Sequence, residues 1–215
     1  RGVPAEFVLQ EDRVQVTQDW LDSTVNPALD AMPKHQRTAV GQDFGRDGDL
    51  SVIWILQEVA PTLWRTAFVV ELRRMPFDIQ RQILFHILDN VPLFHHAKFV
   101  ARGNGQGHAE AALQSYGAAR VDGVRLTAGW SGEWFPRYRR AYEDRSIQVP
   151  KSEDHIADHR LVVLRKGVPA MGDGRCKGAA GGQRHGDAAI AALLAWAAAR
   201  QEGPPPAGAS VNPPP

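Results

Sequence analysis

Three aspartates and a histidine in this chain have the side chains needed to bind a divalent cation beside a phosphate. Asp43 interrupts an apolar segment, and Asp49 follows it across a polar turn. Asp187 opens an Ala-rich segment, with His185 two residues before it. Carboxylate oxygens are the ligands that Mg²⁺ prefers, and hydrolysis of a phosphodiester by two cations requires several carboxylates to converge. We therefore predict Asp43, Asp49 and Asp187 as metal ligands, with Asp43, Asp187 and His185 in catalysis.

Each of these acids also has a purely structural explanation. Asp is common in turns, which accounts for Asp43 and Asp49, and capping and the helix dipole favour an Asp such as Asp187 at the start of a helix. Against this, a carboxylate buried in an apolar strand without a partner is costly, which favours a ligand at Asp43. Glu71 and Asp158 are weaker candidates, because Glu71 fits the solvated face of a strand and Asp158 fits a loop.

Any binding to a nucleic acid would depend on local clusters of basic residues, because the formal net charge of the whole chain is only +1. We predict phosphate contacts from Arg102, Arg165, Lys166 and Arg184. Arg102 opens a Gly-rich turn (102–107) whose backbone N–H groups could approach a phosphate. The sequence contains no GxxxxGK followed by Ser or Thr, so it has no ATP-binding P-loop.

The spacing of apolar residues predicts the elements that position these side chains. Three segments with strand character are joined by short connections, which predicts an antiparallel meander: 37–45, 50–59 and 63–75. Helical and strand periodicities then alternate, which predicts parallel pairing: helix 76–92, strand 97–101, helix 105–117 and strand 119–127. Two further helices (134–147 and 187–200) and a hairpin (159–169) complete the expected order.

The length of 215 residues suits one domain with a sizeable core. We predict a leading segment or linker over 1–36 with a short helix, the domain itself over 37–202, and a disordered Pro-rich tail over 203–215. The single cysteine, Cys176, excludes an internal disulfide, and we expect neither a secretion signal nor a membrane span. Because the chain begins with Arg1 rather than Met, we expect a fragment of a longer protein.

Five segments of the chain together resemble a known family. They occur in a matching order and spacing over about residues 38–200: GQDFGRDGDLSV, VVELRRMPFDIQRQIL, ARGNGQGHAEAALQSYG, EDRSIQVPKSEDHIADHR and RHGDAAIAALLAWAA. The chain resembles the C-terminal nuclease domain of phage large terminases, in particular those of Mu-like phages and prophages.

The resemblance implies an α/β fold of the RNase H-like class, with a mixed central sheet and flanking helices. It implies an endonuclease, dependent on two Mg²⁺ or Mn²⁺ ions, that cuts concatemeric DNA during genome packaging. The implied partners are double-stranded DNA, an ATPase domain that this chain lacks, the portal and the small terminase subunit. The implied location is the cytoplasm of an infected or lysogenic bacterium.

One family position is not matched. The first acid of the family matches Asp43, a secondary acid matches Asp49, and the last acid matches Asp187 with His185 nearby. The middle acid stands where this chain has Val100, which cannot bind a metal. Three explanations stay open: a decayed prophage copy, an engineered inactive variant, or substitution by a neighbouring acid.

Two other functions fit the same fold. A catalytically inactive module would bind duplex DNA through phosphate contacts and dock on a portal or an ATPase domain. A resolvase-type nuclease would prefer branched DNA to linear duplex.

Overall fold

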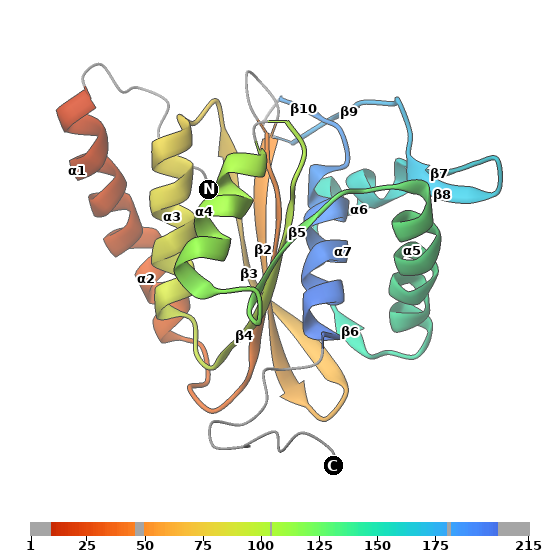
Figure 1. Cartoon of the computed structure of the whole chain (residues 1–215), viewed down its shortest axis with the longest axis horizontal. Coiled ribbons are helices and arrows are strands. Elements are labelled where there is room, and N and C mark those ends of the chain that lie inside the picture. Colours follow the sequence, from red (N-terminus) through yellow and green to blue (C-terminus); the bar gives the residue numbers. More distant parts are fainter. Residues whose placement is uncertain (1–9, 46–49, 104, 180–181, 202–215) are drawn as a thin grey trace, which may run out of the picture.

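The computed structural model describes residues 10–45, 50–103, 105–179 and 182–201, and it is a mixed sheet between two layers of helices (Figure 1). The sheet has six strands in the order β5-β4-β1-β2-β3-β6. The predicted α/β class and the mixed sheet are therefore confirmed. The predicted tail 203–215 and Asp49 lie outside the described residues.

The first three strands form the predicted antiparallel meander. They are β1 (Thr38–Asp43), β2 (Leu50–Ala60) and β3 (Leu63–Arg73). The parallel strands follow: β4 (Phe94–Val100) pairs with β1, β5 (Val121–Val124) pairs with β4, and the short β6 (Ile147–Gln148) pairs with β3. The strand β2 is central and almost fully buried, which explains its continuous apolar sequence.

Each face of the sheet has its own apolar core. Four helices and a π-helical turn cover one face: α1 (Gln10–Trp20), the turn Leu21–Val25, α2 (Asn26–Asp30), α3 (Phe77–Asn90) and α4 (Gly105–Tyr116). Three helices cover the other: α5 (Ala128–Glu143), α6 (Glu153–Arg160) and α7 (Asp187–Ala199). None of the helices in the described parts is long and apolar enough to cross a membrane.

The Ala-rich helix α7 lies directly on the sheet because both surfaces carry small side chains. A Cβ atom added to Gly41 of β1 would stand 2.2 Å from the backbone oxygen of Ala191 and 2.2 Å from the backbone nitrogen of Ala195. Only glycine allows this approach. The contact fixes α7 against β1 and so sets the position of the first residue of the helix.

Three local expectations need adjustment. The short helix expected within 1–36 belongs to the core, because Trp20, Leu21 and Leu29 pack there with α3. The helix α5 begins six residues before the predicted start, since the side chain of Thr127 caps it by accepting a hydrogen bond from the backbone N–H of Trp130. The hairpin occupies β7 (Val162–Arg165) and β8 (Val168–Met171), because α6 takes up the preceding residues.

Candidate metal site at the end of the sheet

Asp43 is the last residue of β1 and faces α7. Side chains alternate along a strand, and Ala39 and Gly41 of the same strand lie against α7. Asp43 pairs with Val52 of β2. On the other side, the parallel register that matches Gln42 with Phe99 brings Val100 beside Asp43. The position of the unmatched family acid is therefore adjacent to Asp43 on the next strand.

Asp187, the first residue of α7, lies at the same end of the sheet. The far end of α7 is fixed by Gln201, whose backbone oxygen accepts a 3.0 Å hydrogen bond from His95 at the start of β4. Since β4 and β1 are parallel, α7 runs antiparallel to β1, and its first residue approaches the strand end that carries Asp43. The structure thus brings these two predicted ligands to one end and one face of the sheet.

The carboxyl group of Asp187 lies in a half-buried position that disfavours its charge. Burial, together with the nearby negative charge of Asp158, raises the pKa of Asp187 to about 6. A 3.3 Å hydrogen bond from the backbone N–H of His185 to Oδ2 only partly compensates. A cation at this carboxylate would supply the missing positive charge.

Replacing Asp187 with Asn is expected to stabilise the protein at pH 8. The pKa of Asp187 is raised in the folded state, so the folded protein binds more protons, and its stability falls as pH rises from about 4 to about 6. We expect a gain of about 1–2 kcal/mol at pH 8, discounted for partial exposure, and none at pH 3.5. Chemical denaturation in EDTA at both pH values measures it, with the exposed Asp30→Asn as control. Equal effects of the two substitutions at pH 8 would contradict it.

The described residues place two of the predicted ligands at this end of the sheet rather than a complete cluster. No group of three or more His, Cys, Asp or Glu residues suited to a metal ion occurs within the described ranges. Mg²⁺ is often held by one or two carboxylates together with waters and substrate phosphates. A single hard cation at this end of the sheet would need Asp43 and Asp187 as its protein ligands, because Val100 offers none. His185 lies in the turn before α7, two residues from Asp187.

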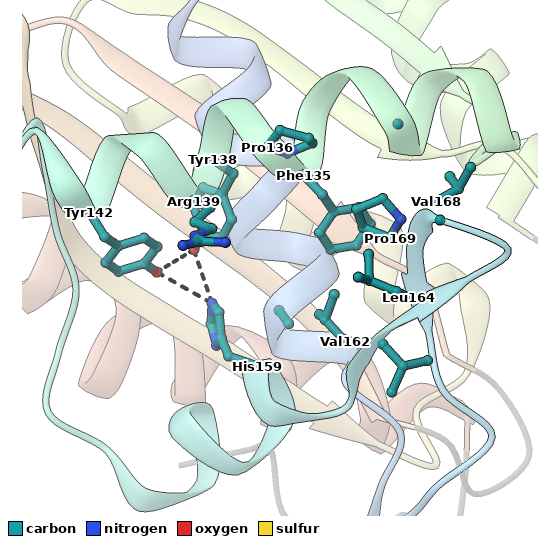
Figure 2. Close-up of a pocket in the computed structure, with 14 residues that line it drawn as sticks. Phe135, Pro136, Tyr138, Arg139, Tyr142, His159, Val162, Leu164, Val168 and Pro169 are labelled. Atoms are coloured by element: carbon teal, nitrogen blue, oxygen red, sulfur yellow. Dashed lines mark hydrogen bonds between the residues drawn. The ribbon is translucent and has the colours of Figure 1, made fainter.

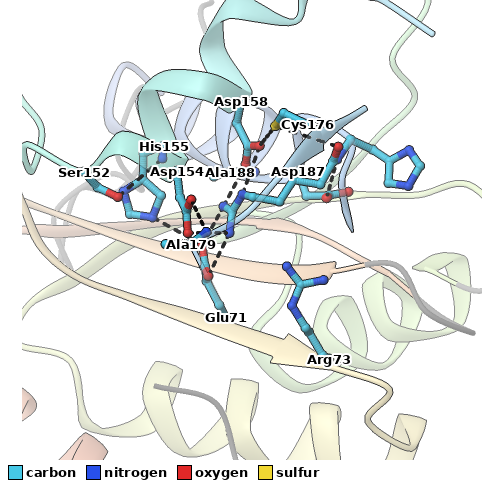
Figure 3. A network of polar contacts seen from close by, with 12 residues as sticks. Glu71, Arg73, Ser152, Asp154, His155, Asp158, Cys176, Ala179, Asp187 and Ala188 are labelled. Carbon is cyan, nitrogen blue, oxygen red and sulfur yellow. Dashed lines mark hydrogen bonds and ion pairs between the residues drawn. The ribbon is translucent and has the colours of Figure 1, made fainter. Parts of the chain in front are cut away.

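The predicted phosphate contact from Arg184 is wrong. The side chain of Arg184 is 1% exposed and cannot contact DNA from this position. Its guanidinium forms bidentate ion pairs with the carboxylates of Glu71 and Asp158, which Figure 3 labels. Nη2 and Nη1 donate to Glu71 at 2.6 and 3.0 Å, and Nη2 and Nε donate to Asp158 at 2.8 and 3.1 Å. Arg184 therefore joins the strand β10 (Gln183–Arg184) to β3 and α6.

The two partners of Arg184 are acids that the sequence left as weak candidates. Burial opposes ionisation of Glu71, but hydrogen bonds from His155 and Arg184 outweigh it and lower the pKa of Glu71 to about 2. Asp158 is fully buried, and its Oδ2 accepts a 3.1 Å hydrogen bond from the backbone N–H of Ala188. Asp158 thereby caps α7 beside Asp187 and positions that residue.

The pairing register across the sheet shows which face of β3 carries Glu71, and this register could have placed Glu71 on the same face as Asp43. Val52 of β2 pairs with Asp43 on one side and with Glu71 on the other. Residues paired directly across strands share a face, so Glu71 faces α7 as Asp43 does. Glu71 therefore does not lie on a solvated face of the sheet.

The hairpin β7–β8 carries two of the predicted DNA-binding residues at its tip. Nη2 of Arg165 pairs with Asp173 at 2.5 Å, and Lys166 is exposed with a φ of 50°. The hairpin packs over α5 around a pocket of about 640 Å³ (Figure 2). At the polar end of this pocket, Nε2 of His159 lies 3.0 Å from the hydroxyl oxygen of Tyr138. The packing of the hairpin strands on α5 thus holds the hairpin tip away from the sheet (Figure 1).

Comparison with known proteins identifies two relatives of this chain. No family model matches it. It is 37% identical over 199 residues to the "Probable terminase, large subunit gp28" of Escherichia phage Mu, covering 92% of this chain. It is 36% identical over 194 residues to the Mu-like prophage FluMu protein gp28 of Haemophilus influenzae, covering 90%. The chain is therefore similar to one part of the Mu-like gp28 proteins. It spans 36% and 38% of the length of these two relatives.

Several solved structures share the fold of this chain. The large terminase nuclease from thermophilic phage G20c matches with a TM-score of 0.56 and 13% identity over 77% of this chain and 83% of that one. The same nuclease with bound magnesium matches with a TM-score of 0.56 and 18% identity over 77% and 82%. The nuclease domain from Thermus phage P74-26 gives a TM-score of 0.53, with 14% identity over 75% and 78%. The predicted RNase H-like fold is therefore confirmed.

Proposed function

We propose that this chain is the metal-dependent DNA endonuclease domain of a phage packaging terminase. The observation that carries the proposal is the position of Asp43 and Asp187 at one end and one face of an RNase H-like sheet. The relative from phage Mu is named a probable terminase large subunit, which supports the cutting of concatemeric DNA during packaging as the biological role.

Asp43 and Asp187 are the residues that would hold Mg²⁺ or Mn²⁺. A bound cation supplies charge stabilisation for the phosphate and lowers the pKa of a bound water. A terminase nuclease of the same fold was solved with bound magnesium, which supports this choice of metal. A second ion would need Asp49 or oxygens of the DNA as additional ligands. His185, beside Asp187, would hydrogen-bond a phosphate oxygen or a metal-bound water.

The residues that touch DNA would lie around this site. Arg102, exposed after β4, and Lys166 at the hairpin tip are the predicted phosphate contacts that remain accessible. Arg165 could join them by leaving its exposed ion pair with Asp173, which costs little at a surface. Arg184 is excluded from this set by its burial.

The proposed partners are double-stranded DNA, an ATPase domain, the portal and the small terminase subunit. The large terminase of phage D6E, solved with ATP-γ-S, matches with a TM-score of 0.50 and 9% identity over 76% of this chain but 40% of that one. This supports a second, nucleotide-binding part in the parent protein. The cytoplasm of an infected or lysogenic bacterium is the proposed location.

Nicking of a supercoiled plasmid in Mn²⁺ tests the proposal. The natural sequence is expected to cut, and Asp43→Asn or Asp187→Asn is expected to lower the rate by about a hundredfold or more, since each removes a cation ligand. The exposed Asp30→Asn serves as the matched control and should cut at the wild-type rate. Cutting that survives both ligand substitutions would refute the assignment of the site.

A second function is a catalytically inactive module that binds DNA and docks on the packaging motor, as in a decayed prophage copy. The observation that favours it is Val100 beside Asp43 in place of an acid. This function predicts salt-sensitive duplex binding with no cutting in Mg²⁺ or Mn²⁺. The plasmid assay and a binding assay on the same preparation therefore separate the two functions.

A further inference from the structure

A cavity of about 410 Å³ opens at the carboxyl ends of β4 and β5, beside Val100. It is lined on one side by Ala101, Arg102 and Gly103, which follow β4, and on the other by Arg125 and Thr127, which follow β5. The cavity thus begins at the strand end next to Asp43 and extends away from α7. None of its described lining residues is acidic.

The chain direction explains why a cavity forms here. After β4 the chain enters α4, which packs on the face covered by α1 and α3, whereas after β5 it enters α5 on the opposite face (Figure 1). Two adjacent parallel strands whose following helices leave to opposite faces separate their loops and open a crevice. In open α/β sheets such crevices outside the carboxyl ends are the usual places for ligands.

The charges around this crevice suit an anion. Among the described residues, neither Arg102 nor Arg125 has a hydrogen bond or ion pair from its guanidinium, and both are exposed. On the helix α5, by contrast, Arg137 pairs with Glu133 at 3.1 Å and Arg139 pairs with Glu143 at 2.9 Å. Two free guanidinium groups at one crevice would repel each other unless a shared anion lies between them.

The helix ends add to the positive potential. The helix α4 begins at Gly105 and α5 at Ala128, with Thr127 as its cap, so both helices start at the rim of the cavity. The positive ends of two helix dipoles therefore point toward it. The Gly103 backbone has open space around it, since a Cβ added there would meet no atom within 4 Å.

We propose that this crevice binds a backbone phosphate of DNA, with Arg102 and Arg125 as the paired contacts. The bound phosphate would belong to the same DNA strand as the phosphate held at Asp43 and Asp187. It would lie on the side of that site where Val100 stands in place of the family's acid. Arginine charge there would hold the DNA without a metal bridge. This inference deepens the proposed function, and it rests on that function for the identification of DNA as the ligand.

Duplex binding in EDTA tests the inference without requiring cleavage. The measurement is fluorescence anisotropy with a labelled 20-bp duplex over a series of salt concentrations, using Arg102→Gln, Arg125→Gln and the double variant. Each substitution is expected to weaken binding about threefold to tenfold and to reduce the slope of log K against log salt by about 0.9. Arg125→Lys is expected to retain the slope, because the charge remains.

Arg120→Gln is the matched control. Arg120 is also exposed but precedes β5, at the opposite end of the same strand. It is expected to bind within twofold of the natural sequence with an unchanged slope. Equal slopes for Arg125→Gln and Arg120→Gln would overturn the inference. A protein that binds as expected but never cuts DNA would refute only the proposed nuclease activity, and one that cuts with an unaffected slope would refute only this crevice.

Discussion

Replacing Val100 with Asp is expected to raise the rate of Mn²⁺-dependent DNA cutting by at least about tenfold, a change of about 1.4 kcal/mol in the barrier. Val100 ends β4 beside Asp43, and adjacent strands lie about 4.8 Å apart, so the new carboxylate would stand within reach of the same cation. A third carboxylate raises cation affinity and fixes the ion in place. Val100 is only partly buried, so the substitution is compatible with folding.

The charge, not the shape, should produce this gain. Val100→Asn has nearly the same size as Val100→Asp but no charge, and we expect it to cut at the wild-type rate. In metal-free buffer Val100→Asp should be less stable by about 1 kcal/mol, because two carboxylates then face each other, and Mn²⁺ should reverse that loss. A gain in cutting that the Asn variant shares would count against a cation between these strands. So would a Val100→Asp variant that neither cuts faster nor is stabilised by Mn²⁺.

Replacing Arg184 with Met is expected to destabilise the protein by about 3 kcal/mol at pH 7.5, because it removes the cation beside the fully buried Asp158 and the partly buried Glu71. Burial opposes the charge of Arg184, but the hydrogen bonds that its guanidinium donates to Glu71 and Asp158 outweigh that effect and raise the pKa of Arg184, so it stays charged in the folded protein. Without this charge, Glu71 on β3 and Asp158 on α6 would lose their guanidinium partner. Urea denaturation with circular dichroism measures the change.

The pH dependence supplies an independent check on Arg184→Met. In the natural protein the pKa of Glu71 is about 2, so its ionisation contributes stability above about pH 4.5 that is lost as pH falls toward 2. Without Arg184, Glu71 would be protonated more easily, and the deficit of the variant should shrink below pH 5. Arg175→Met, which removes an exposed hydrogen bond to Gln183, is the control and should cost less than about 0.5 kcal/mol. Comparable losses for both variants would contradict the buried ion-pair account.

The sequence predicted the elements whose apolar period is strong. The meander β1–β3, the helices α3 and α4, and the closing helix α7 lie within a few residues of their expected bounds. In contrast, α6 was not predicted, since its sequence EDHIADHR has no apolar face, and its position depends on Arg184 and Glu71. Local propensity carries no information about such partners from distant parts of the chain.

The site residues divide in the same way. Asp43 and Asp187 could be proposed as ligands from the sequence because an acid in an apolar strand and an acid at a helix start are local features. The burial of Arg184 could not, because an Arg next to predicted site residues looks like a DNA contact until its two carboxylate partners are known. Arg125 lies in an ordinary strand-to-helix loop, and only the opposite directions of α4 and α5 relate it to Arg102.

A crystal of the natural protein grown with Mn²⁺ tests the central claim most directly. The account predicts an anomalous difference peak within about 2.3 Å of a carboxylate oxygen of both Asp43 and Asp187, at the end of the sheet. An ion bound elsewhere, or carboxyl groups of these two residues held too far apart to share one, would contradict it.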